Sequence, residues 1–141
     1  MKRKALSIVS LLSLFLMGSA FAQRIEVRAN VPFSFSVGSK VLPAGEYNIG
    51  SISSNTHTLL VKANNGKASM IVNSNSAQTL EAAQKTKLVF NRYGSQYFLS
   101  AVWTQGSTSG VQLPKSSREK ELARELAMNH ADQVEVVASL Y

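Results

Sequence analysis

Apolar and polar residues alternate along positions 25–37, where every odd position is apolar and every even position except Pro32 is polar. A period of two indicates a β-strand with one buried face. A straight strand of this length would extend about 40 Å, whereas a compact domain of this chain length is only about 35 Å across. We therefore predict a bend near Pro32, which also lacks an amide donor, and an inward face made of Val31, Phe33, Phe35 and Val37.

Turn signals separate the apolar runs that follow. Gly38-Ser39 fits a tight hairpin, and Asn64-Asn65-Gly66 between two apolar runs is a strong hairpin signal. Pro43 and Gly45 fit the second and fourth positions of a turn. Residues 87–103 form the densest apolar stretch, broken at Gly94, and both of its faces are partly apolar. We expect this hairpin to lie in the middle of the sheet.

The pattern changes after Pro114. Ser116 and Glu119 form an S-x-x-E capping box, and residues 118–129 are rich in helix-forming residue types. Further on, the valines within 134–137 suggest a last short strand.

These patterns predict an all-β fold: an antiparallel small barrel or a two-sheet sandwich of about eight strands, with one C-terminal α-helix. The predicted organisation is a signal peptide at 1–22, a β-domain at 23–115, and a helix with a short tail at 116–141 that packs on the β-domain. Most apolar runs are shorter than the 9–11 residues that a transmembrane β-strand needs. We therefore do not expect the chain to span a membrane after cleavage.

The N-terminus has the three parts of a secretory signal peptide. Residues 2–4 are basic, residues 5–17 are apolar apart from three serines, and small residues occupy Ala20 and Ala22. The apolar run of 13 residues is shorter than the roughly 20 that cross a bilayer. We expect cleavage between Ala22 and Gln23, export of the remaining 119 residues, and a periplasmic or extracellular location.

Composition narrows the chemistry. The chain has no cysteine, which excludes disulfide, thiol and cysteine-zinc chemistry. The net charge of +7 includes three basic residues of the signal. Residues 23–115 carry nine basic and three acidic residues, and residues 116–141 carry three basic and five acidic residues. The excess positive charge of residues 23–115 can favour binding to anionic surfaces. Charge that keeps the protein soluble explains the excess better, because no dense run of basic residues is present. Nucleic acid is not an expected partner.

Candidate catalytic groups are few. The β-body holds three carboxylates, at Glu26, Glu46 and Glu81, and the histidines are His57 and His130. A glycoside hydrolase needs two carboxyl groups about 5–10 Å apart, so a wall or glycan hydrolase would require two of these three to converge. The histidines lack a metal-ligand pattern. We expect no enzyme activity, no metal site and no cofactor.

An aromatic group offers the best candidate binding site. Tyr93, Tyr97 and Trp103 crowd one hairpin together with Arg92. Aromatic side chains beside an arginine can bind sugars, lipids or a protein partner. They also build ordinary β cores, which is the favoured alternative. A second hypothesis is a small apolar-ligand-binding β-barrel whose interior is reached between Tyr93, Tyr97 and Trp103.

Four stretches of the chain, at 31–38, 42–47, 92–103 and 113–119, resemble a group of small signal-peptide-bearing bacterial proteins of unassigned function. Members of the group look like V-P-F-x-F-x-V-G, L-P-A-G-x-Y, R-Y-G-x-Q-Y-F-L-x-x-V-W and L-P-x-S-x-R-E in that order. The resemblance implies export and a β-rich domain, and it brings no catalytic or binding residues. The leading hypothesis is an exported, non-enzymatic β-domain protein of the cell envelope or secreted fraction, with a binding or structural role. Its partner is an unknown envelope component or a small apolar ligand.

Overall fold

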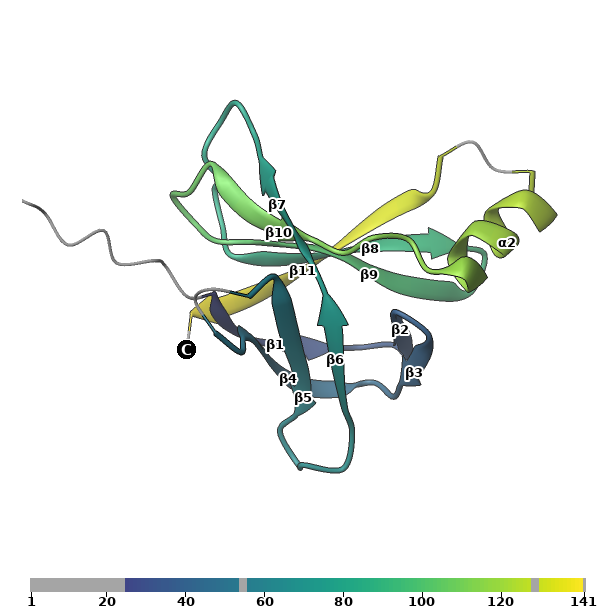
Figure 1. The fold of residues 1–141 in the computed structure, drawn as a ribbon, viewed down its shortest axis with the longest axis horizontal. Helices are drawn as coiled ribbons and strands as arrows, with labels where there is room; N and C mark the ends of the chain where they lie inside the picture. The colour runs from purple at the N-terminus through teal and green to yellow at the C-terminus, as the bar shows by residue number, and fades with distance from the viewer. Residues whose placement is uncertain (1–24, 54–55, 128–129, 141) are drawn as a thin grey trace, which may run out of the picture.

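The computed structural model describes residues 25–53, 56–127 and 130–140, and these form a mainly β structure (Figure 1). The predicted signal peptide and its cleavage residues Ala20, Ala22 and Gln23 lie outside the described residues. The elements are β1 (Glu26–Val31), β2 (Phe35–Val37), β3 (Lys40–Leu42), β4 (Gly45–Ser51), β5 (Thr58–Ala63), β6 (Ser69–Asn73), β7 (Asn75–Gln78), β8 (Lys87–Tyr93), β9 (Gln96–Trp103), β10 (Ser109–Gln112), α2 (Ser117–Glu125) and β11 (Asp132–Leu140).

The strands join into one continuous sheet that curls into a nearly closed barrel. Its order is β3-β2-β9-β8-β11-β1-β4-β5-β6, with β10 beside β9 and β7 beside β10. The all-β prediction is confirmed, although the described residues form eleven strands rather than about eight. The pairs are antiparallel except for β2 and β9, which meet in parallel at Ser36 and Phe98. A barrel leaves few open strand edges.

The first alternating stretch bends where the sequence predicts it. β1 ends at Val31 and β2 begins at Phe35, with Pro32 between them. Val31, Phe35 and Val37 are buried, and Phe33 is partly buried against the same core. The predicted inward face is confirmed. Pro32 separates the strands because it cannot donate a ladder hydrogen bond.

Aromatic side chains fill the centre of the barrel. The Phe35 ring makes edge-to-face contacts with Tyr47 and Phe90, at centroid distances of 5.0 and 5.4 Å. The Tyr47 hydroxyl donates to the carbonyl of Pro43 at 2.5 Å, and burial raises the pKa of Tyr47. A buried phenol needs such a partner because an unpaired hydroxyl in an apolar core costs free energy.

The open seam of the barrel is bridged by side chains. Lys40 on β3 donates from Nζ to the Ser69 carbonyl on β6 at 3.0 Å. A Cβ placed at Gly38 would lie 3.6 Å from Met70 and from Val72, so the β2–β3 hairpin tip lies directly against β6. Gly38 has a φ of +58°, which a glycine adopts without steric cost.

The C-terminal region holds the predicted helix and the predicted last strand, and the strand is longer than expected. Helix α2 covers 117–125, and the expected helix end at 129 lies outside the described residues. Residues 132–140 come after the helix. They form the nine-residue strand β11, which lies between β8 and β1. β11 therefore completes the barrel wall, because its partly buried side at Val134 and Val136 packs against the core. The described part of the chain holds no helix with the length and apolarity needed to cross a bilayer.

Candidate functional site

The outer face of the sheet formed by β8, β9, β10 and β11 carries a groove. Strand alternation sends Leu88 and Phe90 inward to the core and leaves Lys87, Val89 and Asn91 on the opposite face. In Figure 1, the loop after β7 and helix α2 stand at opposite ends of this face. The loop lines one end of the groove, and residues that flank α2 in the chain, Lys115, His130 and Ala131, line the other end.

A β-bulge shapes the floor of the groove. Val89 pairs with Ala101, but the next residue, Phe90, pairs with Leu99, so Ser100 is an extra residue in β9. Ser100 and Ala101 both line the groove. The Ser100 carbonyl accepts a hydrogen bond from the Leu113 backbone N–H at 2.8 Å. Bulges bend a strand and redirect its side chains, and here the bend presents two small side chains in succession.

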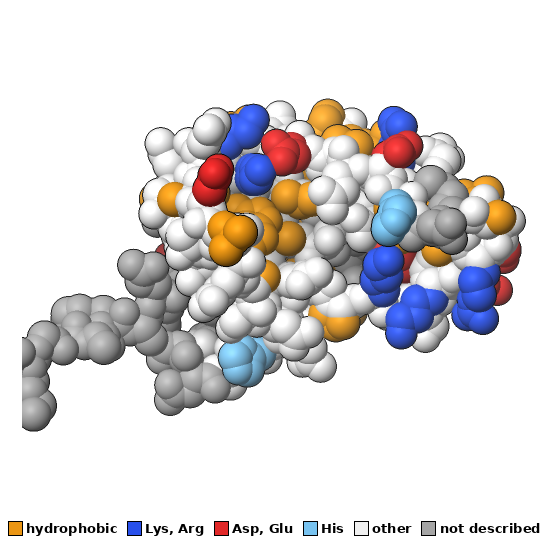
Figure 2. All heavy atoms as spheres, turned by 90° about the horizontal axis from the view of Figure 1, so that it is seen from above, with side chains coloured by type: hydrophobic (Ala, Val, Ile, Leu, Met, Phe, Trp, Pro, Cys, Tyr) orange, Lys and Arg blue, Asp and Glu red, His pale blue; other side chains and the backbone are white. Residues whose placement is uncertain are grey.

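The larger part of the groove has a volume of about 670 Å³. Val89, Ala101 and Trp103 line it from the sheet, and Thr79 and residues 81–85 line it from the loop after β7. Figure 2 looks down on this face and shows hydrophobic side chains gathered in a hollow beside acidic and basic side chains. The size lies within the 300–1,000 Å³ of typical ligand pockets.

A second hollow of about 460 Å³ continues the groove toward α2, where Asn91, Lys115 and His130 line it. Three residues line both hollows: Ser100, Gln112 and Gln133. The groove thus follows β8 from Lys87 to Asn91, a distance of about 13 Å at the usual rise per strand residue. Its shape suits an extended ligand that lies along the strands.

Charged groups in the larger hollow are largely paired. Lys87 Nζ lies 2.5 Å from Glu135 Oε1, and Lys85 Nζ lies 3.9 Å from Glu135 Oε2. Glu81 also lines this hollow, so two acidic residues balance two basic ones. The smaller hollow carries Lys115 and His130 at its rim.

Trp103 has a fixed position in the floor. It pairs with Gly110 across β9 and β10. A Cβ at position 110 would lie 2.4 Å from Trp103 Cε3 and 2.8 Å from the Val102 carbonyl oxygen. The indole therefore occupies the space that a side chain at 110 would need, and Gly110 lets it lie over the backbone of β10.

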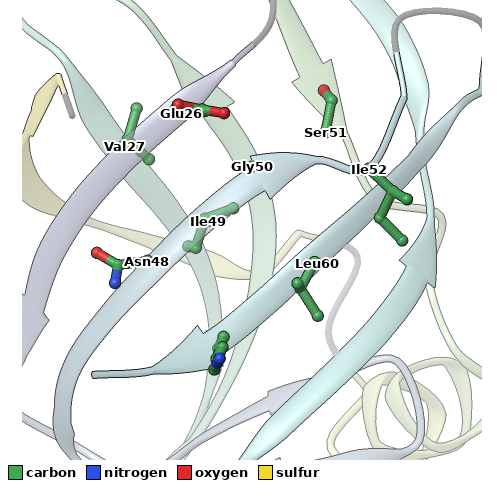
Figure 3. Close-up of a pocket in the computed structure, with 9 residues that line it drawn as sticks. Glu26, Val27, Asn48, Ile49, Gly50, Ser51, Ile52 and Leu60 are labelled. Carbon is green, nitrogen blue, oxygen red and sulfur yellow. The ribbon is translucent and has the colours of Figure 1, made fainter. Parts of the chain in front are cut away.

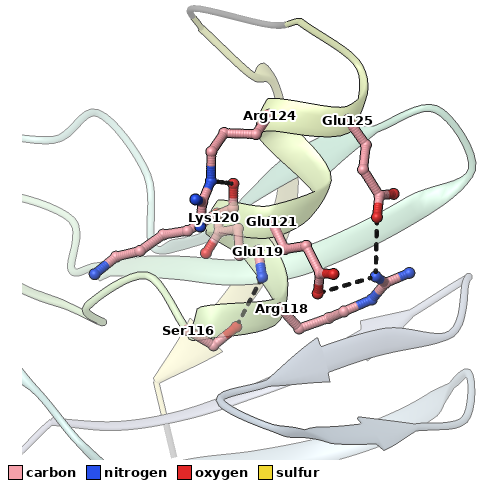
Figure 4. A network of polar contacts seen from close by, with 7 residues as sticks. All are labelled: Ser116, Arg118, Glu119, Lys120, Glu121, Arg124 and Glu125. Atoms are coloured by element: carbon pink, nitrogen blue, oxygen red, sulfur yellow. Dashed lines mark hydrogen bonds and ion pairs between the residues drawn. The ribbon is translucent and has the colours of Figure 1, made fainter.

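Helix α2 is held on the sheet beside the smaller hollow by a buried carboxylate, which bonds the lining residue Asn91. Glu119 Oε1 accepts from Asn91 Nδ2 at 2.9 Å and from the Tyr93 hydroxyl at 3.1 Å. The Glu119 backbone N–H donates to Ser116 Oγ at 3.1 Å, which confirms the predicted N-cap (Figure 4). Burial, and after it the Glu119 carboxylate, raises the pKa of Tyr93 to about 12. Leu122 packs with Tyr93 in a small core beneath the helix.

The four residues of the predicted aromatic site do not converge. Trp103 lines the groove, whereas Tyr93 is buried beneath α2. Tyr97 packs on the core side, stacked on Phe33 at a centroid distance of 3.8 Å. Arg92 pairs with Asp132 at 3.2 Å, and its hydrogen bonds with Asp132 and then Tyr97 raise its pKa. The structure therefore brings Arg92 and Tyr97 together as cross-strand partners, whereas Tyr93 and Trp103 lie apart from them on the outer face.

The candidate carboxylates of a hydrolase are also dispersed. Glu26 lines a separate hollow of about 230 Å³ over β1, β4 and β5 (Figure 3). Glu46 pairs with Arg28 at 3.5 Å, and Glu81 lines the larger part of the groove. The hollow in Figure 3 is narrower and more apolar, with Ile52 and Leu60 among its lining residues.

Metal-binding groups do not gather in the described residues, where no three of His, Asp and Glu lie close enough together to hold an ion. Comparison with protein-family models, with curated proteins and with solved structures gives no match to this chain.

Sequence reasoning overlooked most of the groove. The shared residues Ser100, Gln112 and Gln133 come from three strands that are distant in sequence. Each is a polar residue on the solvent side of its strand, a pattern that a simply solvated surface also produces. The single tryptophan of the chain is the one signal that pointed to this face.

Proposed function

We propose that the protein is an exported, non-enzymatic β-domain protein of the cell envelope or secreted fraction, and that it binds a partner molecule in the groove over β8–β11. The N-terminal signal pattern supports export. The groove favours a binding role over a purely structural one, because structural surfaces do not require a walled hollow of ligand size.

The observation that carries this proposal is the continuity of the two hollows through Ser100, Gln112 and Gln133. A strand bulge, the loop after β7 and the segments that flank α2 combine to make one concave surface. Loops and helices that wall a rigid sheet are a common way to hold a ligand.

Two other functions receive less support. A small apolar ligand inside the barrel would compete with the side chains of the core, including Phe35, Tyr47 and Phe90, which are almost fully buried there. A hydrolase would need a pair of carboxylates in one cleft. Glu26 lines a different hollow from Glu81, and Glu135, which shares the larger hollow with Glu81, is held in ion pairs with Lys85 and Lys87.

The first test is localisation. A full-length chain with a C-terminal tag is followed by cell fractionation and N-terminal sequencing. We expect the exported fractions to contain a chain that begins at Gln23. Recovery from the cytoplasm with residues 1–22 retained would contradict export.

The second test is retention of envelope components by the immobilised protein. Gln133→Arg places a bulky cation in the groove at an exposed position, and Gln96→Arg makes the same change at an exposed position in the β8–β9 turn region. We expect components retained by the wild type and by Gln96→Arg to be lost with Gln133→Arg. Equal retention by all three proteins would show that the groove is not the binding site.

A further inference from the structure

The groove has an aromatic platform in Trp103. The indole is held over the Gly110 backbone and is only partly buried, while it lines the larger hollow. A flat apolar ring that is fixed on one side presents a preformed surface for another flat, weakly polar face. Pyranose rings have such a face, because their C–H groups gather on one side of the ring.

Four glutamine side chains surround this platform: Gln78, Gln84, Gln112 and Gln133. All four are exposed, and none of their amides has a hydrogen-bond partner in the described part of the chain. A primary amide both donates and accepts, as a sugar hydroxyl does. Such amides can therefore exchange water for ligand hydroxyls without leaving an unpaired group.

The charge of the larger hollow disfavours an ionic ligand. Both of its lysines, Lys85 and Lys87, lie within ion-pair distance of Glu135, and Glu81 adds a further negative charge. An anionic ligand would meet these carboxylates, and a cationic ligand would compete with the two lysines. An uncharged ligand avoids both costs.

From these features we propose that the groove binds an uncharged glycan chain. One sugar ring stacks on Trp103, and the hydroxyls of the chain bond to the amides of Gln112 on β10 and Gln133 on β11, so the chain crosses β9 and β8 between them. This assignment rests on the proposed binding function and specifies its ligand class.

Trp103 also supplies the assay, because it is the single tryptophan of the protein. The full-length chain is titrated with soluble neutral oligosaccharides, namely chitin, cellulose and maltose oligomers, while the indole emission is recorded. We expect at least one series to give a saturable change in emission. The affinity should change little between low and high salt, because salt screens charge interactions and this ligand carries no charge.

The Gln112→Ala/Gln133→Ala variant tests the amides, with Gln96→Ala/Gln105→Ala as the matched control. All four positions are exposed, so both variants should fold normally. Loss of two hydrogen bonds should weaken binding about tenfold or more in the first variant and leave it unchanged in the control.

The outcomes separate the ligand class from the function. If no neutral series changes the emission, or if only oligogalacturonate does so and salt abolishes the effect, the uncharged-glycan assignment is overturned. The Gln133→Arg retention test then decides separately whether the groove is a binding site. If a neutral oligosaccharide changes the Trp103 emission but binds equally to both double variants, Gln112 and Gln133 do not bond it and the assignment of the glycan to these amides is overturned.

Discussion

Removing the Glu119 carboxylate should detach helix α2 from the sheet. Glu119 is only 4% exposed, and its Oε1 accepts hydrogen bonds from Asn91 and Tyr93. Hydrogen bonds to a charged group contribute about 1.5–3 kcal/mol each. Burying a carboxylate costs free energy, and the alanine variant no longer incurs this cost, which offsets part of the loss of the two hydrogen bonds. We therefore expect Glu119→Ala to lower the free energy of unfolding by about 3 kcal/mol, a large part of the 5–15 kcal/mol of a typical domain.

Urea unfolding monitored by circular dichroism measures this loss. With an m-value of about 1.5 kcal/mol/M, the midpoint should fall by about 2 M. Glu121→Ala is the control, because Glu121 lies on the same helix and makes only an exposed ion pair with Arg118 at 3.5 Å. Such pairs contribute less than about 1 kcal/mol. If Glu119→Ala is no less stable than Glu121→Ala, the carboxylate does not hold the helix, and the reasoning is refuted.

Three further predictions follow from single residues. Because the folded-state pKa of Tyr93 is raised to about 12, ionisation favours unfolding as pH rises above 10, and wild-type stability should lose up to about 3 kcal/mol between pH 10 and 12. Urea unfolding at several pH values should show that the free energy of unfolding of Tyr93→Phe falls less steeply between pH 10 and 12 than that of the wild type. If the two proteins lose stability equally over this range, the raised pKa does not belong to Tyr93. Gly110→Ala should displace the Trp103 indole, shift its emission and cost about 1–3 kcal/mol, whereas the exposed Ser109→Ala should do neither. Gly94→Ala should cost about 1 kcal/mol in thermal unfolding through its φ of +61° alone, since open space surrounds it; an unchanged midpoint would show that the turn relaxes.

Local patterns predicted much of the fold. The alternation of residues 25–37 gave the correct inward face, because a strand with one buried side must repeat every two residues. The hairpins at Gly38, Gly66 and Gly94 were also recognisable, and each glycine has a positive φ. These features depend on neighbours in sequence, so a single chain reveals them.

Pairings between distant segments were not predictable in the same way. β11 pairs with β8 on one side and β1 on the other, and its moderate apolar pattern does not distinguish a central strand from an edge strand. Glu119 shows the same limit at the level of one side chain. The capping box led us to expect a purely local role, whereas the fold directs its carboxylate to Asn91 and Tyr93, nearly thirty residues earlier in the chain.

The groove depends both on local patterns and on pairings between distant segments. Only Trp103, its aromatic member, can therefore be recognised from the sequence. Its floor requires the one-residue register shift opposite Val89, and a shift of register changes which side chains share a face. Its shared lining requires β10, β9, β8 and β11 to lie side by side in that order, although the chain between Gln112 and Gln133 passes through α2. A lone tryptophan near other aromatic residues suggests a binding surface, but Tyr97 packs on the core side and Tyr93 is covered by α2 at the far end of the outer face. The glutamines that line the same hollow are scattered along the sequence. They become neighbours only when the sheet forms, so the sequence alone does not mark them as a set.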